Sequence, residues 1–289
     1  MRVLVWLVLL SLSLPTAADP VCATDSLARK VCLKAPAQRI ITLAPHLAEN
    51  VFSAGAGDRL VGVTSYSDYP EAAKAIPRVG SFNAFSLEQI SASDPDLILV
   101  WGSGNGGRAL SQLEDLGFTV YVDELQSIED IPTSIRAIGQ LAGTLHKAEP
   151  AAAAFVDEVE ALRANTDTAS VTVFYQIWNQ PLQTVGGKHI ISEVIATCGG
   201  RNLFSDNGQL APQVSLESVL ARNPDVIIGS TMDSSEPVWL QEWQRYPGLK
   251  AVQQGQIFAV NPDTLQRPTL RLADGIGEIC KRLQQAHHR

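Results

Sequence analysis

Ser86-Leu87-Glu88, six residues and Pro95-Asp96-Leu97-Ile98 return in the second half of the chain as Ser215-Leu216-Glu217, six residues and Pro224-Asp225-Val226-Ile227. The two copies begin 129 residues apart (215 − 86), nearly half of the 289-residue chain. In each copy the serine is placed to cap a short helix, and a Pro-Asp turn leads into an apolar strand. A helix–turn–strand unit that occurs twice predicts two similar α/β lobes with a ligand-binding cleft between them.

Apolar runs alternate with helical patterns on both sides of the repeat. In the first half we expect strands at 39–43, 60–64, 97–101 and 119–122, and helices at 47–55, 87–92 and 108–116. In the second half we expect strands at 171–176, 226–229 and 257–260, and helices at 190–197, 216–221 and 270–284. Strands that alternate with helices predict mainly parallel sheets. A weaker echo, Glu-x5-Gly at Glu49–Gly55 and Glu193–Gly199, agrees with a duplicated fold.

The alternation stops between residues 128 and 165, where two helical patterns follow each other with no strand between them. In the second pattern Phe155, Val159 and Leu162 recur at helical spacing. We expect this helix to connect the lobes and to limit their swing, because a helix is stiffer than a Gly/Ser linker. The predicted organisation is a signal peptide 1–18, an N-terminal lobe 19–146, a connecting helix 147–166 and a C-terminal lobe 167–289.

The first 18 residues have the features of an export signal. Arg2 precedes an apolar run at 3–14, and Thr16-Ala17-Ala18 offers small residues for cleavage. Removing this segment takes away one charged residue, Arg2, and changes the net charge from −8 to −9. We therefore expect a soluble, periplasmic, monomeric protein, and its acidity argues against nucleic acid or anionic membranes as partners.

Export to an oxidising compartment favours disulfides among the four cysteines. Cys22 and Cys32 flank a polar turn and would close a terminal hairpin, in which case Cys198 and Cys280 would pair. Four cysteines allow three connectivities, and the sequence does not choose among them. A disordered end with free thiols is the alternative for Cys22 and Cys32.

A glycine-rich stretch, Gly102-Ser-Gly104-Asn-Gly-Gly107, matches the Gly-x-Gly-x-x-Gly pattern between a predicted strand and helix. With Asp123 as the ribose-binding acid, it would indicate an exported nucleotide-dependent oxidoreductase. Its place in the middle of a lobe, in an exported chain, argues against this function. The simpler interpretation is a loop that lets a ligand approach the backbone.

Aromatic side chains fall at strand ends and in predicted loops. Tyr66 and Phe82 lie in polar surroundings, Trp101 ends a predicted strand, and Trp178 lies two residues after another. Core packing is the default role for any one of them. A cluster of such rings at one cleft would suit a large, flat, partly apolar ligand.

Polar candidates also follow predicted strands. Asp263 and Arg267, after the last strand, would clamp the amide or carboxylate edges of a ligand or form a surface salt bridge. His46, after the first strand, would be a haem or metal ligand or a residue of the cleft wall. The other histidines form no recognisable ligand set with it, so we expect no metal site.

The repeat carries a matched pair of acids, Glu88 and Glu217. Each would stabilise the first turn of its helix through the helix dipole. Two carboxylates related by pseudo-symmetry would also suit two basic sites on a two-fold partner. The sequence contains no Gly-x-Ser-x-Gly elbow and no His-Glu-x-x-His motif, so nothing indicates an enzyme, and we expect no cofactor.

Three further stretches, with the repeat, resemble the helix-linked substrate-binding proteins of bacterial ABC importers. They are Arg39-Ile-Ile-Thr-Leu-Ala-Pro45, Val63-Thr-Ser-Tyr-Ser-Asp-Tyr-Pro70 and Cys198-Gly-Gly-Arg-Asn-Leu-Phe204. The resemblance runs from about Arg39 to the end of the chain, and the Ser-Tyr-Ser-Asp-Tyr-Pro run is typical of the cobalamin-binding branch. It implies two lobes joined by a helix, modest opening and closing, and delivery of a corrinoid to a permease dimer. A siderophore or haem carrier, with His46 as ligand, is the alternative within the family.

The resemblance also implies roles for individual residues. Contacts with the corrin ring and its amide edges would come from Tyr66, Phe82, Trp101, Asp263 and Arg267. Phe82 and Ala211 stand where cobalamin binders have tryptophan, which leaves more room on one face of the ligand, and Trp178 would compensate. Glu88 and Glu217 would face arginines of the permease, and Cys198 would pair with Cys280. Cys22 and Cys32 have no counterpart in that branch.

Overall fold

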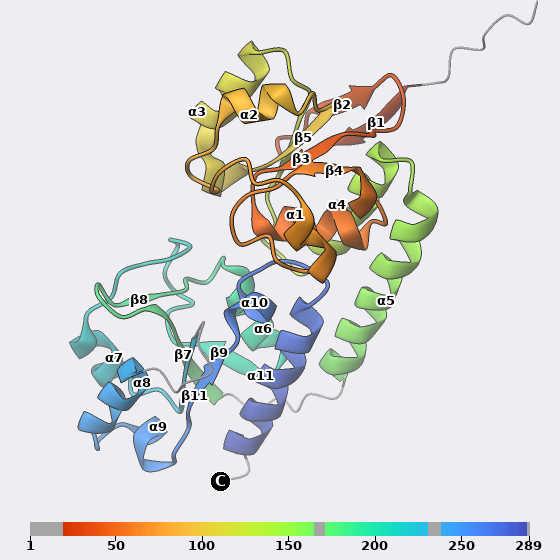
Figure 1. Cartoon of the computed structure of the whole chain (residues 1–289). Coiled ribbons are helices and arrows are strands. Elements are labelled where there is room, and N and C mark those ends of the chain that lie inside the picture. The colour runs from red at the N-terminus through yellow and green to blue at the C-terminus, as the bar shows by residue number, and fades with distance from the viewer. Residues whose placement is uncertain (1–19, 165–170, 231–237, 288–289) are drawn as a thin grey trace, which may run out of the picture.

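Two lobes, each built around its own sheet, make up the part of the chain that the structure describes (Figure 1). The structure is a computed structural model that describes residues 20–164, 171–230 and 238–287. The predicted signal peptide, and residues 165 and 166 of the predicted connector, lie outside these ranges. None of the helices within them is long and apolar enough to cross a bilayer.

The N-terminal lobe contains a four-stranded parallel sheet in the order β4-β3-β5-β6. Its strands are β3 (Ile40–Thr42), β4 (Leu60–Gly62), β5 (Leu97–Trp101) and β6 (Val120–Asp123). Its helices are α1 (Pro45–Ser53), α2 (Leu87–Ala92), α3 (Gly102–Asp115) and α4 (Asp130–Leu141). Leu97 and Leu99 of β5 join one core cluster, whereas Ile98 and Val100 join another, with Ile90 of α2. Both faces of the strand are buried, which explains its unbroken apolar sequence.

The C-terminal lobe repeats this plan with a second sheet, in the order β11-β10-β7-β8 and with β9 also paired to β7. Its strands are β7 (Val171–Trp178), β8 (Gln183–Thr184), β9 (Gly200–Asn202), β10 (Val226–Ser230) and β11 (Ile257–Val260), and only the β7–β8 pair is antiparallel. Its helices are α6 (Ile190–Thr197), α7 (Leu216–Arg222), α8 (Val238–Glu242), α9 (Lys250–Gln253), α10 (Pro262–Leu265) and α11 (Leu272–His287). The sequence did not predict β8, β9 and α8 to α10, because elements this short show no clear periodicity.

The repeated serine and aspartate side chains make equivalent hydrogen bonds in the two lobes. Ser86 Oγ and Ser215 Oγ cap α2 and α7, as the sequence predicts, each accepting a backbone N–H at 3.2 Å. The Asp96 carboxylate accepts the backbone N–H of Gln38 at 2.7 Å, at the entrance to β3. The matched Asp225 carboxylate accepts the N–H of Thr172 at 2.9 Å, at the start of β7. Each aspartate therefore joins the repeat strand to the start of its neighbour in the sheet.

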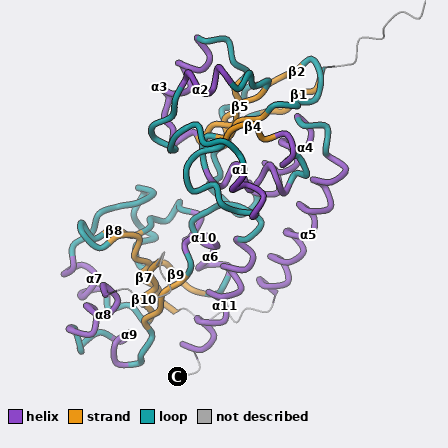
Figure 2. The backbone as a smooth tube through the Cα atoms, in the orientation of Figure 1, coloured by secondary structure: helices purple, strands orange, loops and turns teal. Residues whose placement is uncertain are grey.

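One long helix, α5 (Leu145–Ala164), runs from the upper lobe along the side of the molecule (Figure 2). It packs against α4 and against α11 of the other lobe. Phe155 and Val159 of α5 share one continuous core with Ile276 and Ile279 of α11. This shared core resists bending between the lobes more than a free linker would.

Both disulfides are present, and the pairs are Cys22–Cys32 and Cys198–Cys280. The first joins directly opposed residues of a hairpin formed by β1 (Val21–Thr24) and β2 (Lys30–Leu33). The hairpin packs on α4, so Cys22 and Cys32 lie in a folded part of the chain. The second joins the end of α6 to α11.

Mild reduction is expected to open Cys22–Cys32 first. Cys32 is exposed at the edge of the hairpin, whereas Cys198 and Cys280 are 3% and 6% exposed. Thiol–disulfide exchange requires access of the attacking thiolate to a sulfur. After treatment of the native protein with glutathione and alkylation, peptide mass spectrometry should find label on Cys22 and Cys32 well before the other pair. Equal labelling rates for the two pairs would contradict this order.

Candidate functional site

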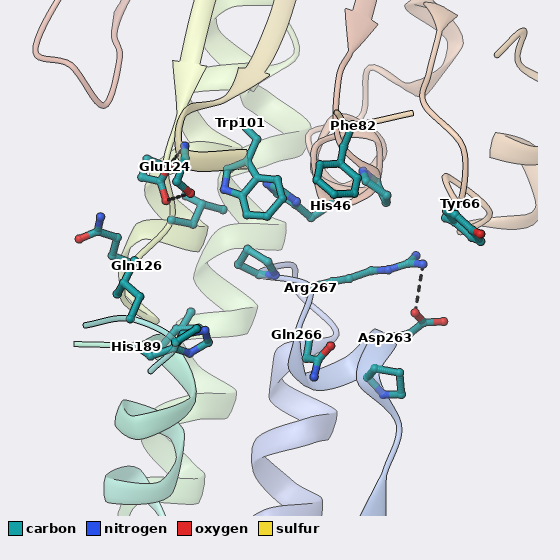
Figure 3. Close-up of a pocket in the computed structure, with 18 of the residues that line it drawn as sticks. His46, Tyr66, Phe82, Trp101, Glu124, Gln126, His189, Asp263, Gln266 and Arg267 are labelled. Carbon is teal, nitrogen blue, oxygen red and sulfur yellow. Dashed lines mark hydrogen bonds and ion pairs between the residues drawn. The ribbon is translucent and has the colours of Figure 1, made fainter. Parts of the chain in front are cut away.

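A cleft of about 540 Å³ opens between the lobes, at the carboxyl ends of β3, β5 and β6 and opposite α6 and α10 (Figure 3). Parallel strands present their carboxyl ends at one edge of a sheet, and the loops that follow them form the usual ligand crevice of α/β folds. Five of the six side chains predicted to bind ligand line this cleft: Tyr66, Phe82, Trp101, Asp263 and Arg267.

Trp101 forms the centre of an aromatic corner on the N-terminal side of the cleft. The Phe82 ring lies 5.9 Å from it, centroid to centroid, and the His46 ring meets it edge-on at 5.3 Å. Tyr66, at the mouth, is 68% exposed and has a φ of 66°, a left-handed conformation uncommon for an aromatic residue. These rings give one wall of the cleft a broad apolar surface.

The glycine-rich stretch holds this corner together, and it forms a helix where the sequence predicts a loop. Residues 102–107 belong to the first turns of α3, with Gly106 alone outside helical geometry at a φ of 78°. A side chain at Gly104 would come within 1.9 Å of the Trp101 ring, so the glycine makes room for the indole. Asn105 accepts the Trp101 backbone N–H at 2.7 Å and donates to the carbonyl oxygens of Leu43 and Phe82.

Asp123, the acid that a dinucleotide site would use, does not face the cleft. Its carboxylate is buried and accepts a hydrogen bond from the Ser134 hydroxyl. Burial raises the pKa of Asp123 to about 7 although the bond from Ser134 opposes this change. A side chain enclosed in this way is not placed to bind a ribose.

Part of the facing wall, on the C-terminal side, is aliphatic. Ile190, Leu210 and Ala211 line it. Trp178, predicted to compensate for Ala211, does not line the cleft. It is 62% exposed at the end of β7, and its indole N–H donates to the Gln180 carbonyl. A flat ligand would therefore meet aromatic rings on one face and smaller side chains on the other.

Arg267 joins the two lobes within the cleft. Its guanidinium lies 3.0 Å from Asp263 in its own lobe, and 2.9 Å from Glu49 and 3.0 Å from Asp68 in the other. Burial opposes the charge, but the bonds to Glu49 and Asp68 outweigh it and raise the pKa of Arg267. The Asp263–Arg267 pair predicted from the sequence is thus part of an interlobe network that also includes Arg271, 2.7 Å from Glu49.

Several polar residues of the cleft were not predicted from the sequence. Glu124 and Gln126 follow β6, Lys188 and His189 precede α6, and Gln266 follows α10. Their only signal in the sequence was a position close to the end of a strand or helix, which is weak evidence for any single residue. The His189 ring accepts the Ile191 backbone N–H at 3.1 Å as the cap of α6, and burial lowers the pKa of His189 to about 4.

His46 is neutral and largely enclosed. Burial, with a smaller effect of the Arg267 charge, lowers the pKa of His46 to about 3. Its Nε2 atom is covered by protein and has no hydrogen-bond partner. No group of three or more His, Cys, Asp or Glu side chains suited to a metal ion occurs within the described ranges. His46 is therefore part of the cleft wall in this structure.

Comparison with known proteins settles the family. A family model described as periplasmic binding protein matches residues 40–264. The chain belongs to this family. As a member it is a periplasmic ligand-binding protein of the transport type and not an enzyme.

Several relatives are similar to this periplasmic binding protein over most of their length. The vitamin B12-binding protein of Vibrio campbellii is 38% identical over 86% of this chain and 90% of its own. That of Pectobacterium carotovorum is 37% identical over 85% of this chain and 88% of its own. The crystal structure of the vitamin B12-binding protein BtuF of Vibrio cholerae superposes with a TM-score of 0.81 at 36% identity, covering 88% of this chain and 99% of that one. The haem-binding protein RhuT of Roseiflexus superposes with a TM-score of 0.77 at 25% identity, covering 86% and 99%.

Proposed function

We propose that this protein captures cobalamin or a related corrinoid in the cleft and delivers it to an ABC importer. The observation that carries the proposal is the aromatic corner of Trp101 and Phe82 in a cleft with charged residues at its edge. A corrinoid has an apolar macrocycle with a rim of amide side chains, which matches this distribution. Relatives at 37–38% identity carry the name vitamin B12-binding protein, which supports the same ligand.

The proposal assigns the remaining parts of the chain. Residues 1–18 are a signal peptide cleaved near Ala18, and 19–146 and 167–289 are lobes joined by the connecting segment 147–166. The mature protein is a soluble monomer in the periplasm that holds its cargo without a covalent step.

Glu88 and Glu217 are proposed to dock on the permease dimer. Both are exposed in the first turn of α2 and α7, helices capped in the same way. In Figure 1 α2 lies toward the left of the upper lobe and α7 toward the left of the lower lobe, and α5 lies on the right. One acid in each lobe suits a partner with two equivalent basic sites.

Calorimetric titration with cyanocobalamin, haemin and a ferric hydroxamate tests the ligand. Cyanocobalamin is expected to bind most tightly. Tight haemin binding that is lost in His46→Ala, with no corrinoid binding, would overturn the proposal in favour of a haem carrier.

Trp101→Ala is expected to weaken cyanocobalamin binding by at least about tenfold, because an indole contributes a large apolar contact area. The matched control is Trp178→Ala, which removes a tryptophan that lies outside the cleft. Its affinity should stay within about twofold of the wild type. Equal losses in the two variants would show that the aromatic corner is not the binding surface.

A further inference from the structure

Glu124 is a carboxylate in the wall of the cleft that is bonded to the first turn of α3. It follows β6 and lies on the same side as Trp101 (Figure 3). Its Oε1 accepts the Ser103 hydroxyl at 2.9 Å, and its Oε2 accepts the Ser103 backbone N–H at 2.5 Å. A side chain at Gly102 would come within 2.8 Å of Oε2, so this glycine makes room for the carboxylate.

The two bonds from Ser103 orient the carboxylate without using all its acceptor positions. Each oxygen of an ionised carboxylate has a second lone pair, and the group can donate nothing. The side chain is partly exposed to the cleft. The Glu124 carboxylate can therefore accept a hydrogen bond from an N–H or O–H group of a ligand, and it repels an anionic group.

We propose that Glu124 is a specificity-determining residue that accepts a hydrogen bond from an amide side chain at the ligand rim and rejects ligands with a carboxylate there. The inference rests on the corrinoid function proposed above. It adds a recognition contact at the end of the cleft opposite Tyr66, beside the aromatic corner (Figure 3).

The amino-terminal hairpin positions this residue from outside the cleft. Ser26, in the turn between β1 and β2, accepts the Glu124 backbone N–H on its Oγ at 2.8 Å and donates its own N–H to the Val122 carbonyl at 3.0 Å. The turn is itself held by Asp25, whose carboxylate is bonded to the Arg29 side chain at 2.6 Å and 2.8 Å. The hairpin lies before residue 40, where the match to the family model begins. Ser26 is therefore a positioning residue for Glu124.

A purely structural role is the competing explanation, since Glu124 bonds to the first turn of α3. Loss of such a bond would lower the stability of the protein and weaken the binding of all ligands by the same factor. Recognition of an amide would instead change the ratio between ligands that differ at that amide. The measurement that separates the two is therefore a ratio of affinities.

Glu124→Gln is the informative variant, because it keeps the size and one acceptor but removes the charge. Calorimetry would compare cyanocobalamin with its b-, d- and e-monocarboxylic acids, in which one propionamide is a propionate. We expect the wild type to bind at least one acid about tenfold more weakly than cyanocobalamin, and Glu124→Gln to reduce that discrimination to about threefold or less. Affinity for cyanocobalamin itself should fall by about three- to tenfold. Unchanged ratios in the variant would overturn the proposal.

Ser26 tests the positioning. Ser26→Ala removes the acceptor of the Glu124 N–H and should weaken discrimination against the same acid. Ser26→Thr keeps a hydroxyl and should preserve that discrimination. Ser111→Ala is the matched control, because the Ser111 hydroxyl bonds within α3, to the Gly107 carbonyl, and does not line the cleft. Discrimination by Ser26→Ala equal to that of the wild type would contradict the role of the hairpin. Failure of the wild type to bind cyanocobalamin would instead refute the proposed function.

Discussion

Glu49→Ala is expected to destabilise the protein by about 3–5 kcal/mol, the range found when one partner of a buried ion pair is removed. Glu49 is 2% exposed and bridges two arginines of the other lobe, Arg267 at 2.9 Å and Arg271 at 2.7 Å. The variant would leave both guanidinium groups partly buried without their shared carboxylate. Urea unfolding followed by tryptophan fluorescence measures the change.

The control for Glu49 is Glu71→Ala, which removes an exposed acid paired with Lys74 three residues later. A pair of this kind contributes little, so no clear change in the unfolding midpoint is expected. A loss below about 1 kcal/mol for Glu49→Ala would show that water replaces the carboxylate at this site, and that the network does not hold the lobes.

The Glu49 network also explains the Glu-x5-Gly echo between the lobes. Glu49 of α1 reaches Arg267 and Arg271 in the C-terminal lobe. Its counterpart, Glu193 of α6, accepts the backbone N–H of Ile128 in the N-terminal lobe at 2.8 Å. Repeat-related glutamates therefore cross the lobe interface in opposite directions, which restricts the relative movement of the lobes together with α5.

Glu88→Arg combined with Glu217→Arg is expected to abolish corrinoid uptake and to leave ligand affinity unchanged. The substitutions change four charge units on the proposed docking face and touch no residue that lines the cleft. Charge reversal at an electrostatic interface replaces attraction by repulsion. Uptake of radiolabelled cyanocobalamin by liposomes that contain the importer measures delivery, and calorimetry measures affinity.

The matched control for docking is Asp157→Arg with Glu158→Arg, which makes the same charge change at exposed positions of α5. This variant should support normal uptake, since α5 lies away from α2 and α7 in Figure 1. Normal uptake by the Glu88/Glu217 double variant would end the docking proposal. Equal loss in both variants would show that net charge matters and the face does not.

Much of the fold follows from the repeat and from local signals in the sequence. The helix at 87–92 and the strand at 97–101 have the predicted bounds, and so do the helix at 190–197 and the strand at 257–260. Each is long enough, or marked clearly enough by a cap or a glycine, for local sequence to decide it. The connector begins at Leu145, two residues before the predicted 147.

The candidate site was predicted less completely. Trp101 reaches the cleft because it is the last residue of β5, a relation that sequence order reveals, whereas Tyr66 and Phe82 lie in the segment between β4 and α2 that folds back to the cleft. Trp178 also ends a strand, but β7 extends two residues past its predicted end, and the ring lies outside the cleft. Glu124 was missed because its partners, Ser103 and Ser26, are 21 and 98 residues away in the chain.

The sequence by itself determined the duplicated α/β plan, the helical connector and the exported, acidic character of the chain, because these depend on periodicity, caps and composition within short windows. Only the tertiary structure decided which polar groups meet. Gly104 leaves space for the Trp101 ring, and Gly102 leaves space for the Glu124 carboxylate. Arg267 forms ion pairs with acids of both lobes. Such contacts depend on how distant segments pack, and no local pattern records them.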